Sequence, residues 1–409
     1  MSNVANTEKP FNLAIPDADI EHLQRALELA RFPDELDGAG WDYGAPLADV
    51  KRLVAHWKSG FDWRKAEVEI NKLPMSTRDI EVDGFGTLNV HYVHQVSDVK
   101  GAIPLLFVHG WPGHFLEVRK MLPLLTAGGE DHPSFHVVAP SLPGFGFSEA
   151  PHKPGFKGPQ YAELLNKLML SLGYDEYVYQ GGDWGLLLGR YTAFQYGHKH
   201  VKAWHTNMPL IPLLYTRSLL TMPFDKTAQR KLAETSQFMV SGRGYSTQQS
   251  TRPQTIGYGL SDSPVGLLAW IYEKLVWWSD KYPWTDDEVL EWISIYWFSR
   301  AGPAASTRIY YETSNGGAAC DRPPSWLDLV RLPKLWSQSL GKLVFESEHD
   351  AGGHFAAFEV PEKLAGDLRK MYGKGGSAFG VISGKTGYDR AGLDRRTRGT
   401  SEAIKCVVQ

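Results

Sequence analysis

The stretch that decides the fold is YVYQGGDWG, residues Tyr177–Gly185. A short apolar run ends there in two glycines, and a stretch with helical character follows. Glycines two positions on either side of a central residue permit the strained strand-to-helix turn, usually written G-x-S-x-G, that exposes a nucleophile. The central residue here is Asp183, whose carboxylate needs no base at pH 7 and can attack an electrophilic carbon to give an ester. The alternative is that Asp183 only caps the following helix, which is a common role for aspartate.

Other short apolar runs surround this stretch and end in Gly- or Pro-rich loops. PLLFVHG starts at Pro104 and FHVVAP at Phe135, while VKAWH and KLVFES follow at Val201 and Lys342. Apolar strands interleaved with helical stretches indicate an α/β fold with a mostly parallel sheet covered on both faces. Ligands bind such sheets at the carboxyl ends of the strands, which is where the loops HGWPG and GGDWG fall.

The loop HGWPG, His109–Gly113, can aim a backbone N–H at the nucleophile. In the α/β-hydrolase fold, the oxyanion hole pairs such an N–H with that of the residue after the nucleophile. These groups would belong to Trp111 and Trp184, and we expect both residues to contact the substrate as well. The alternative is an ordinary tight turn. Loop and elbow occur together in the right order, which favours the oxyanion hole.

A histidine follows the last of these strands, in the segment ESEHDAGGHFAA, Glu346–Ala357. His354 comes after two glycines, so it lies on a loop that can reach the top of the sheet. The chain order nucleophile, acid, histidine is the one that this fold uses. His349 is the nearest rival, but only His354 combines the Gly-Gly loop with an apolar run after it.

The chain divides into five segments. Residues 1–95 predict an N-terminal helical meander and a first hairpin, and residues 96–209 and 307–372 carry the strand pattern of the core. Residues 210–306 are rich in Trp, Leu and Tyr at helical spacing. We interpret them as an inserted helical cap, and not as part of a separate C-terminal domain, because the strand pattern resumes afterwards. Residues 373–409 are rich in Gly and Arg, and we expect a disordered tail.

Composition excludes several classes of protein. The formal net charge of −3 gives no basic footprint for nucleic acid. Two cysteines, Cys320 and Cys406, provide neither a disulfide framework nor a thiolate metal cluster. The N-terminus lacks the apolar stretch of a signal peptide, and no apolar run reaches the ~18 residues of a membrane span. We therefore expect a cytoplasmic protein.

The last four residues, CVVQ, fit the C-a-a-X pattern of prenylation, and the final glutamine suits a farnesyl group on Cys406. Arg395, Arg396 and Arg398 lie upstream and would add attraction to an anionic membrane. Membrane association is expected only if Cys406 is prenylated.

Five motifs together resemble a known family. GGDWG, HGWPG, SLPGFGFSEAP, the stretch Ser250–Lys274 and GGHFAAFEVPEKL are similar to those of epoxide hydrolases of the microsomal type, most closely their soluble fungal members. The resemblance extends from about Phe11 to Tyr372. It implies the α/β-hydrolase fold with a meander and a cap, and the hydrolysis of an epoxide to a vicinal diol without metal or organic cofactor.

The resemblance also implies an orienting acid. In the family this acid lies about 26 or 27 positions before the histidine, and a Pro-x-x-Trp follows it. Asp328 lies 26 positions before His354 and is followed by Pro333–Trp336, so it would orient the imidazole. Ser-Trp-Leu stands here where the family has Phe-Pro, which leaves Glu346 and Asp321 as alternatives.

Two cap tyrosines complete the implied site, because the oxygen of an opening epoxide needs an acid partner. Tyr245 matches the first family tyrosine and Tyr310 the second, with Tyr311 one step away. Asp183 would open the ring as an alkyl ester, and His354 would activate the water that hydrolyses it. Four cap tryptophans suggest a bulky apolar epoxide, or else they are core residues: Trp270, Trp277, Trp278 and Trp297.

Other functions share parts of this pattern. A haloalkane or haloacid dehalogenase uses the same Asp elbow, histidine and ester, but needs halide donors such as Trp instead of a tyrosine pair. An epoxide-opening cyclase would release a cyclic ether instead of a diol. The missing elbow serine argues against an esterase, and the complete set of expected catalytic residues argues against a binding protein without turnover. Substrate, stereochemistry and oligomeric state stay open, a homodimer being one of the assemblies considered.

Overall fold

The computed structural model describes residues 8–128, 130–212, 236–314, 329–331, 342–389 and 405–408. In these residues, a nine-stranded sheet has the order β1-β2-β3-β5-β4-β6-β7-β11-β10. Its strands are β1 (Lys9–Pro10), β2 (Met75–Val82), β3 (Gly86–Gln95), β4 (Ile103–Val108), β5 (Phe135–Pro140), β6 (Tyr177–Gly181), β7 (Val201–Thr206), β10 (Lys342–Glu346) and β11 (Lys405–Val408). Pairing is antiparallel from β1 to β5 and parallel from β5 to β10. The predicted α/β-hydrolase fold with a mostly parallel sheet is confirmed.

Helices cover both faces of the parallel strands. They are α4 (Leu122–Thr126), α5 (Gly158–Ser171), α6 (Trp184–Tyr196), the short α13 (Ala356–Glu359) and α14 (Pro361–Tyr372). In β4, Leu106 and Val108 pack in one core cluster with α5 and α6, whereas Leu105 and Phe107 pack in a second cluster with α4 and α14. Since successive strand residues face opposite sides, burial on both faces requires the continuous apolar runs seen in the sequence.

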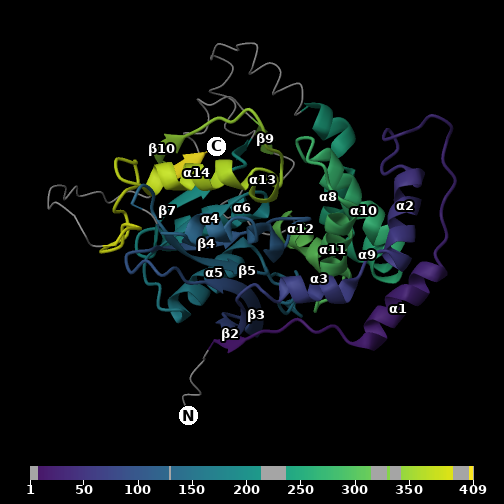
Figure 1. Ribbon diagram of the computed structural model, residues 1–409, viewed down its shortest axis with the longest axis horizontal. Coiled ribbons are helices and arrows are strands. Elements are labelled where there is room, and N and C mark those ends of the chain that lie inside the picture. The colour runs from purple at the N-terminus through teal and green to yellow at the C-terminus, as the bar shows by residue number, and fades with distance from the viewer. Residues whose placement is uncertain are drawn as a thin grey trace.

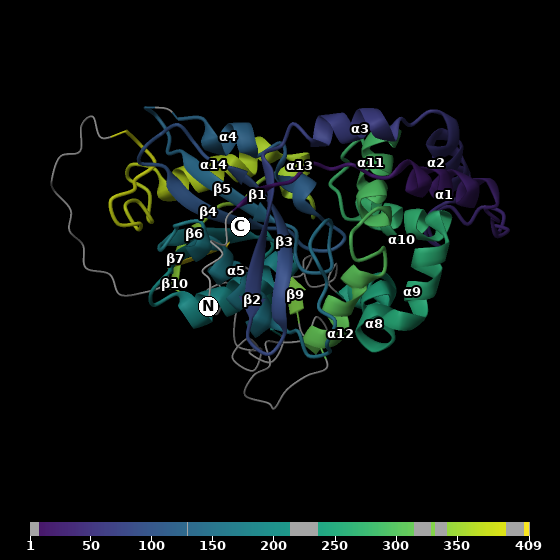
Figure 2. The ribbon, with the colours of Figure 1, turned by 90° about the horizontal axis from the view of Figure 1, so that it is seen from below.

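A second group of helices lies beside the sheet (Figures 1 and 2). It comprises α8 (Gly244–Thr251), α9 (Pro253–Asp262), α10 (Pro264–Trp277), α11 (Asp286–Trp297) and α12 (Arg308–Ser314). The N-terminal helices α1 (Asp17–Glu28) and α2 (Leu47–Ser59) pack on α10, and α3 (Trp63–Ile70) follows them. Helix α12 packs against α8, although it lies beyond residue 306, where we expected the cap to end.

Side-chain caps fix where these helices begin. The Ser263 hydroxyl accepts a hydrogen bond from the N–H of Gly266 at the start of α10. Thr285 and Glu288 form a reciprocal capping box at the start of α11. Short elements complete the described chain: the 3₁₀ turns Phe115–Val118 and Ala305–Thr307, the π-turn Phe238–Gly242, and a two-stranded sheet of β8 (Leu210–Pro212) with β9 (Leu329–Arg331). The boundaries of the five segments stay predictions.

The C-terminal region differs from the expected disordered tail. Residues 373–389 form turns, with Ala378 and Ile382 buried in the core cluster that also holds α14. Residues 405–408 form β11, which pairs with both β7 and β10. The prediction of disorder was therefore wrong for residues 373–389. Turns bury single apolar residues without a repeating pattern, so the packing of this segment leaves no periodicity in the sequence. Cys406 lies in β11, and its farnesylation stays a prediction. No helix among the described residues has the length and apolar character needed to cross a membrane.

Candidate active site

Asp183 lies at the turn between β6 and α6. Its backbone has φ 52° and ψ −123°, a region of conformational space that residues other than glycine rarely adopt. The turn is closely packed: a Cβ on Gly181 would lie 2.8 Å from the backbone of Gly185, and one on Gly185 would lie 2.2 Å from the carbonyl oxygen of Val108. Both glycines of the elbow are therefore needed for close approach. Strained residues of this kind are concentrated at functional sites.

The Asp183 carboxyl group is buried and held by backbone N–H groups. Its Oδ1 accepts a hydrogen bond of 2.8 Å from the N–H of Trp111. Burial raises the pKa of Asp183 to about 7, although the N–H groups of Trp111 and Trp184 act to lower it. The two N–H groups expected to form an oxyanion hole thus converge on this carboxyl group.

The loop His109–Gly113 is fixed by hydrogen bonds from two sides. His109 donates from Nδ1 to the carbonyl oxygen of Gly110 at 2.9 Å, and its Nε2 accepts from the N–H of Leu142 at 3.1 Å. This arrangement requires the neutral imidazole, and burial lowers the pKa of His109 to about 4. From α11, Trp292 Nε1 donates to the carbonyl oxygen of Pro112, and the Tyr296 hydroxyl donates to that of Gly113, both at 2.7 Å.

His354 lies between β10 and α13, next to the carboxylate. Its Nε2 is 3.8 Å from Asp183 Oδ2, the oxygen not bonded to Trp111. The backbone N–H of His354 donates to the carbonyl oxygen of Trp278 at 2.7 Å, and the two rings lie 4.8 Å apart. His349 instead pairs with Asp367 at 2.7 Å. The structure therefore brings His354, and not His349, to Asp183.

Both candidate tyrosines lie over this site. Tyr245, from α8, stacks on Trp111 with centroids 5.1 Å apart and planes 7° apart. Tyr310, from α12, meets Trp111 and Trp184 edge to face at 5.7 and 4.8 Å, and its ring centroid is 5.9 Å from that of Tyr245. Burial and the charge of Asp183 raise the pKa of both hydroxyls. Tyr311 is 40% exposed, so the register favours Tyr310.

Asp328 and its rival Asp321 lie outside the described residues, as does the Pro-x-x-Trp that follows Asp328. Glu346 is the last residue of β10. The role of Asp328 stays a prediction.

Sequence reasoning missed Glu117, a carboxylic acid beside the site. A Cβ on Gly113 would lie 1.6 Å from Glu117 Oε1, so the carboxyl group rests directly on the HGWPG loop. Burial, together with the charge of Asp183, raises the pKa of Glu117 to about 8. Glu117 is therefore largely protonated at neutral pH. In the sequence, the only sign of this residue was its place five residues after Pro112. A single glutamate forms no recognisable motif, so this position could not be identified as part of the site.

A cavity of about 1110 Å³ leads to Tyr245 and Trp278. Its aromatic walls come from the N-terminal segment and the cap, including Trp41, Tyr43, Phe238, Trp270 and Trp277. Three of the four cap tryptophans singled out in the sequence thus line the cavity. The fourth, Trp297, is buried in the core and stacks on His22. A second cavity of about 580 Å³, between α9 and α12, contains none of the candidate catalytic residues in its lining.

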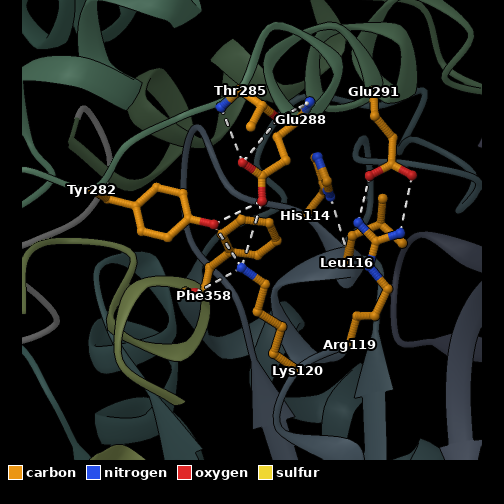
Figure 3. Close-up of polar contacts among 9 residues, drawn as sticks. All are labelled: His114, Leu116, Arg119, Lys120, Tyr282, Thr285, Glu288, Glu291 and Phe358. Carbon is orange, nitrogen blue, oxygen red and sulfur yellow. Dashed lines mark hydrogen bonds and ion pairs between the residues drawn. The ribbon is translucent and has the colours of Figure 1, made fainter.

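Polar contacts fasten α11 and the preceding loop to the core (Figure 3). Arg119 donates through both terminal nitrogens to the Glu291 carboxylate. Lys120 donates to the Tyr282 hydroxyl at 2.7 Å, and that hydroxyl donates to Glu288 Oε1 at 2.7 Å. Lys120 also donates to the carbonyl oxygen of Phe358, in α13. The cap is thereby joined to the segment after the 3₁₀ turn Phe115–Val118 and to α13, the helix after His354.

A carboxyl group at a strand-to-helix elbow, N–H groups that converge on it and a histidine at the carboxyl edge of the sheet are arranged as the α/β-hydrolase fold arranges them. The sequence agrees: residues 103–239 match the family described as alpha/beta hydrolase fold. Residues 8–118 match the family described as epoxide hydrolase N terminus. Among the described residues, no cluster of three or more His, Cys, Asp or Glu side chains could hold a metal ion.

Relatives identify the family. A putative epoxide hydrolase of Stigmatella aurantiaca is 39% identical over 89% of this chain and 84% of its own length. Epoxide hydrolase 1 of Sus scrofa is 34% identical over 89% of this chain and 88% of its own length. The solved structure of the Aspergillus niger epoxide hydrolase superposes with a TM-score of 0.74 at 32% identity, over 88% of this chain and 95% of that one. The solved structure of the juvenile hormone epoxide hydrolase of Bombyx mori superposes with a TM-score of 0.78 at 29% identity, over 89% of this chain and 93% of that one.

The chain belongs to the epoxide hydrolase family, as its motifs indicated, and it is an enzyme of the hydrolase class.

Proposed function

We propose that this epoxide hydrolase converts an apolar epoxide to a vicinal diol through an ester on Asp183. The observation that carries the proposal is that the two oxygens of the Asp183 carboxylate have different neighbours. Oδ1 accepts from the N–H of Trp111 at 2.8 Å, and Oδ2 lies 3.8 Å from His354 Nε2. One oxygen thus occupies the oxyanion hole while the other is free to attack.

In the first step, Asp183 Oδ2 bonds to a ring carbon of the epoxide and the C–O bond of the ring breaks. Tyr245 and Tyr310 hold the departing oxygen, which takes up a phenolic proton to become a hydroxyl group. The raised pKa of both phenols keeps them protonated and able to donate at neutral pH.

In the second step, His354 takes a proton from water, which attacks the ester carbonyl. The oxyanion that forms is stabilised by the N–H groups of Trp111 and Trp184, and the diol leaves as Asp183 is restored. The phenol recovers its proton from the histidinium or from solvent. In this proposal Asp328 orients the imidazole, and every group that takes part belongs to the protein, the substrate or water.

The cavity beside Tyr245 supports an apolar substrate. Its walls include Trp270, Trp277 and Trp278, and flat aromatic surfaces favour aryl or branched apolar groups. The tyrosine pair over Asp183 favours epoxide opening over dehalogenation, because a halide leaves without needing a proton. A cyclic ether product would instead indicate an epoxide-opening cyclase.

The test is a single turnover with styrene oxide in oxygen-18 water, followed by mass spectrometry of the diol and the protein. On the ester route, the first diol carries unlabelled oxygen, and the label enters the peptide that contains Asp183. An Asp183→Ala protein of unchanged fold should show no turnover. Labelled diol with unlabelled protein would mean direct attack by water and would overturn the assignment of Asp183.

A further inference from the structure

Lys274 is a buried cation that the reaction as written does not use. It lies on α10 with 3% of its side chain exposed, and it lines the cavity that reaches Tyr245. Its Nζ donates to Glu273 Oε2 at 2.7 Å, the single hydrogen bond that it makes within the described part of the chain. Buried ammonium groups lose their hydration and are rare unless paired. A methionine would fill this space at lower cost, so stability alone does not account for the lysine.

The remaining neighbours of the ammonium group are aromatic faces. Nζ lies over the Tyr245 ring at 5.3 Å from its centroid and over the Trp270 ring at 4.9 Å. Trp270 is held in place by a hydrogen bond of 3.0 Å from its Nε1 to Gln249. The tyrosine expected to meet the epoxide oxygen is therefore stacked on Trp111 and also lies against a fixed positive charge.

Tyr310 has different surroundings. Its ring meets Trp111, Trp184 and Tyr245, and its hydrogen bond with Tyr245 acts to lower the pKa of Tyr245 and to raise the pKa of Tyr310. The two phenols, which are equivalent in the sequence pattern, thus differ in their polar surroundings. A nearby cation favours the phenolate and makes the O–H a stronger donor, whereas the charge of Asp183 acts in the opposite direction on both phenols.

We propose that Lys274 is a positioning residue that makes Tyr245 the proton donor to the opening epoxide, while Tyr310 only orients the oxygen. When the ring C–O bond breaks, the Tyr245 proton moves to the departing oxygen, and the ammonium of Lys274 stabilises the phenolate left behind. Glu273 keeps the lysine charged and offsets part of its effect on Tyr245, because the charge of Glu273 acts to raise the pKa of that phenol. The inference rests on the proposed tyrosine-assisted opening of the ring.

The test is a double-mutant cycle on the single-turnover rate of ester formation, measured by rapid quench and mass spectrometry with styrene oxide. Lys274→Met should slow ester formation about ten- to thirtyfold, as expected for a desolvated cation–π contact. Hydrolysis of the ester should change less than about twofold, since the tyrosines act only in the first step. Lys274→Arg should restore most of the rate.

The cycle separates this role from packing. In a Tyr245→Phe background, Lys274→Met should have almost no further effect, whereas in a Tyr310→Phe background its full effect should remain. Equal loss in both backgrounds would overturn the inference. If Lys274→Met does not fold, the Lys274→Met/Glu273→Gln pair keeps the charge balanced and serves in its place. A Tyr245→Phe protein with unchanged ester formation would instead contradict the proposed function itself.

Discussion

At the residue scale, burial disfavours the charge on the Asp183 carboxyl group, the proposed nucleophile. The same burial that shields Asp183 from water raises its pKa to about 7, and the charge on Asp183 contributes to raising the pKa of Glu117 to about 8. Neutral pH thus favours one negative charge in this corner, carried by the carboxyl group that receives the N–H of Trp111. A second charge there would be repelled by the first.

Ester formation should therefore depend on pH. Attack requires the carboxylate form of Asp183, whose pKa is raised to about 7. The rate of ester formation should therefore fall as the pH drops through about 7 and reach a plateau above it. In a His354→Gln protein the ester forms without being hydrolysed, and its rate of formation reports on Asp183 without the histidine. Glu117→Gln should leave this fall in rate unchanged, since Glu117 is already protonated at and below neutral pH. A rate that stays constant from about pH 5 to 8 would contradict the raised pKa.

Gly110 is a position where a single methyl group should stop catalysis. A Cβ on Gly110 would lie 2.3 Å from Asp183 Oδ1, so Gly110→Ala must displace the nucleophile from the N–H of Trp111. We expect kcat to fall by about a hundredfold or more, the usual cost of losing an oxyanion contact. Gly366→Ala, in α14 with nothing within 4 Å of its Cβ, is the matched control. It should keep full activity and gain about 0.5–1 kcal/mol of stability.

At the scale of elements, α11 links the cap to the catalytic loop. Trp292 and Tyr296 hold the carbonyl groups of Pro112 and Gly113, and Glu291 receives Arg119. Trp292 and Tyr296, four positions apart on this helix, thus fix the loop whose N–H binds Asp183, and Glu291 holds the segment that follows it. The capping box at Thr285 sets where this helix begins and hence which of its side chains face the loop.

The Arg119–Glu291 pair should contribute measurably to stability. Its side chains are only 28% and 13% exposed, so Glu291→Gln leaves a partly buried guanidinium without a charged partner. We expect a loss of about 1–3 kcal/mol in the free energy of unfolding, measured by urea denaturation. Glu21→Gln removes the same charge from the exposed pair with Arg25 and should cost clearly less. Equal losses would show that the cap contact adds nothing.

Elements with a repeating pattern could be predicted, and isolated residues could not. The helices and the hairpin predicted within residues 1–95 appear as α1, α2, β2 and β3, and the apolar runs quoted from the core appear as β4, β5, β6, β7 and β10. The elbow and the His354 loop could be found because glycines mark them. Lys274 and Glu117 could not, because their importance comes from burial among residues far away in sequence. The turns at 373–389 were missed for a similar reason: they bury Ala378 and Ile382 without any period.

At the scale of the whole molecule, the cavity that reaches Tyr245 is built from two distant parts of the chain. Trp41 and Tyr43 come from the loop between α1 and α2, and Phe238, Trp270 and Trp277 come from the region after residue 236. The N-terminal meander therefore does more than support the cap, because it supplies one wall of the route to Tyr245.

Shortening that wall should change specificity by size. Trp41→Ala removes a large apolar surface, so KM for a bulky aryl epoxide should rise about five- to tenfold, whereas a small aliphatic epoxide should be affected less than about twofold. Phe194→Ala, at an 86% exposed position on α6 outside the cavity lining, is the control. The measurement is steady-state kinetics on both epoxides. A uniform change for both substrates would mean that Trp41 affects the fold and not the pocket.

The contacts of Lys120 have a consequence for how the enzyme fails. This one side chain reaches Tyr282 of the cap region and the carbonyl of Phe358, just after the histidine, from the loop that follows the oxyanion turn. Since Lys120 joins the cap region both to its own segment and to α13, we expect that the cap cannot separate from the core without disturbing the surroundings of Asp183 and His354. On heating, loss of turnover and loss of tertiary structure should therefore follow a single curve, and the enzyme should have no inactive but folded stage from which cooling recovers it.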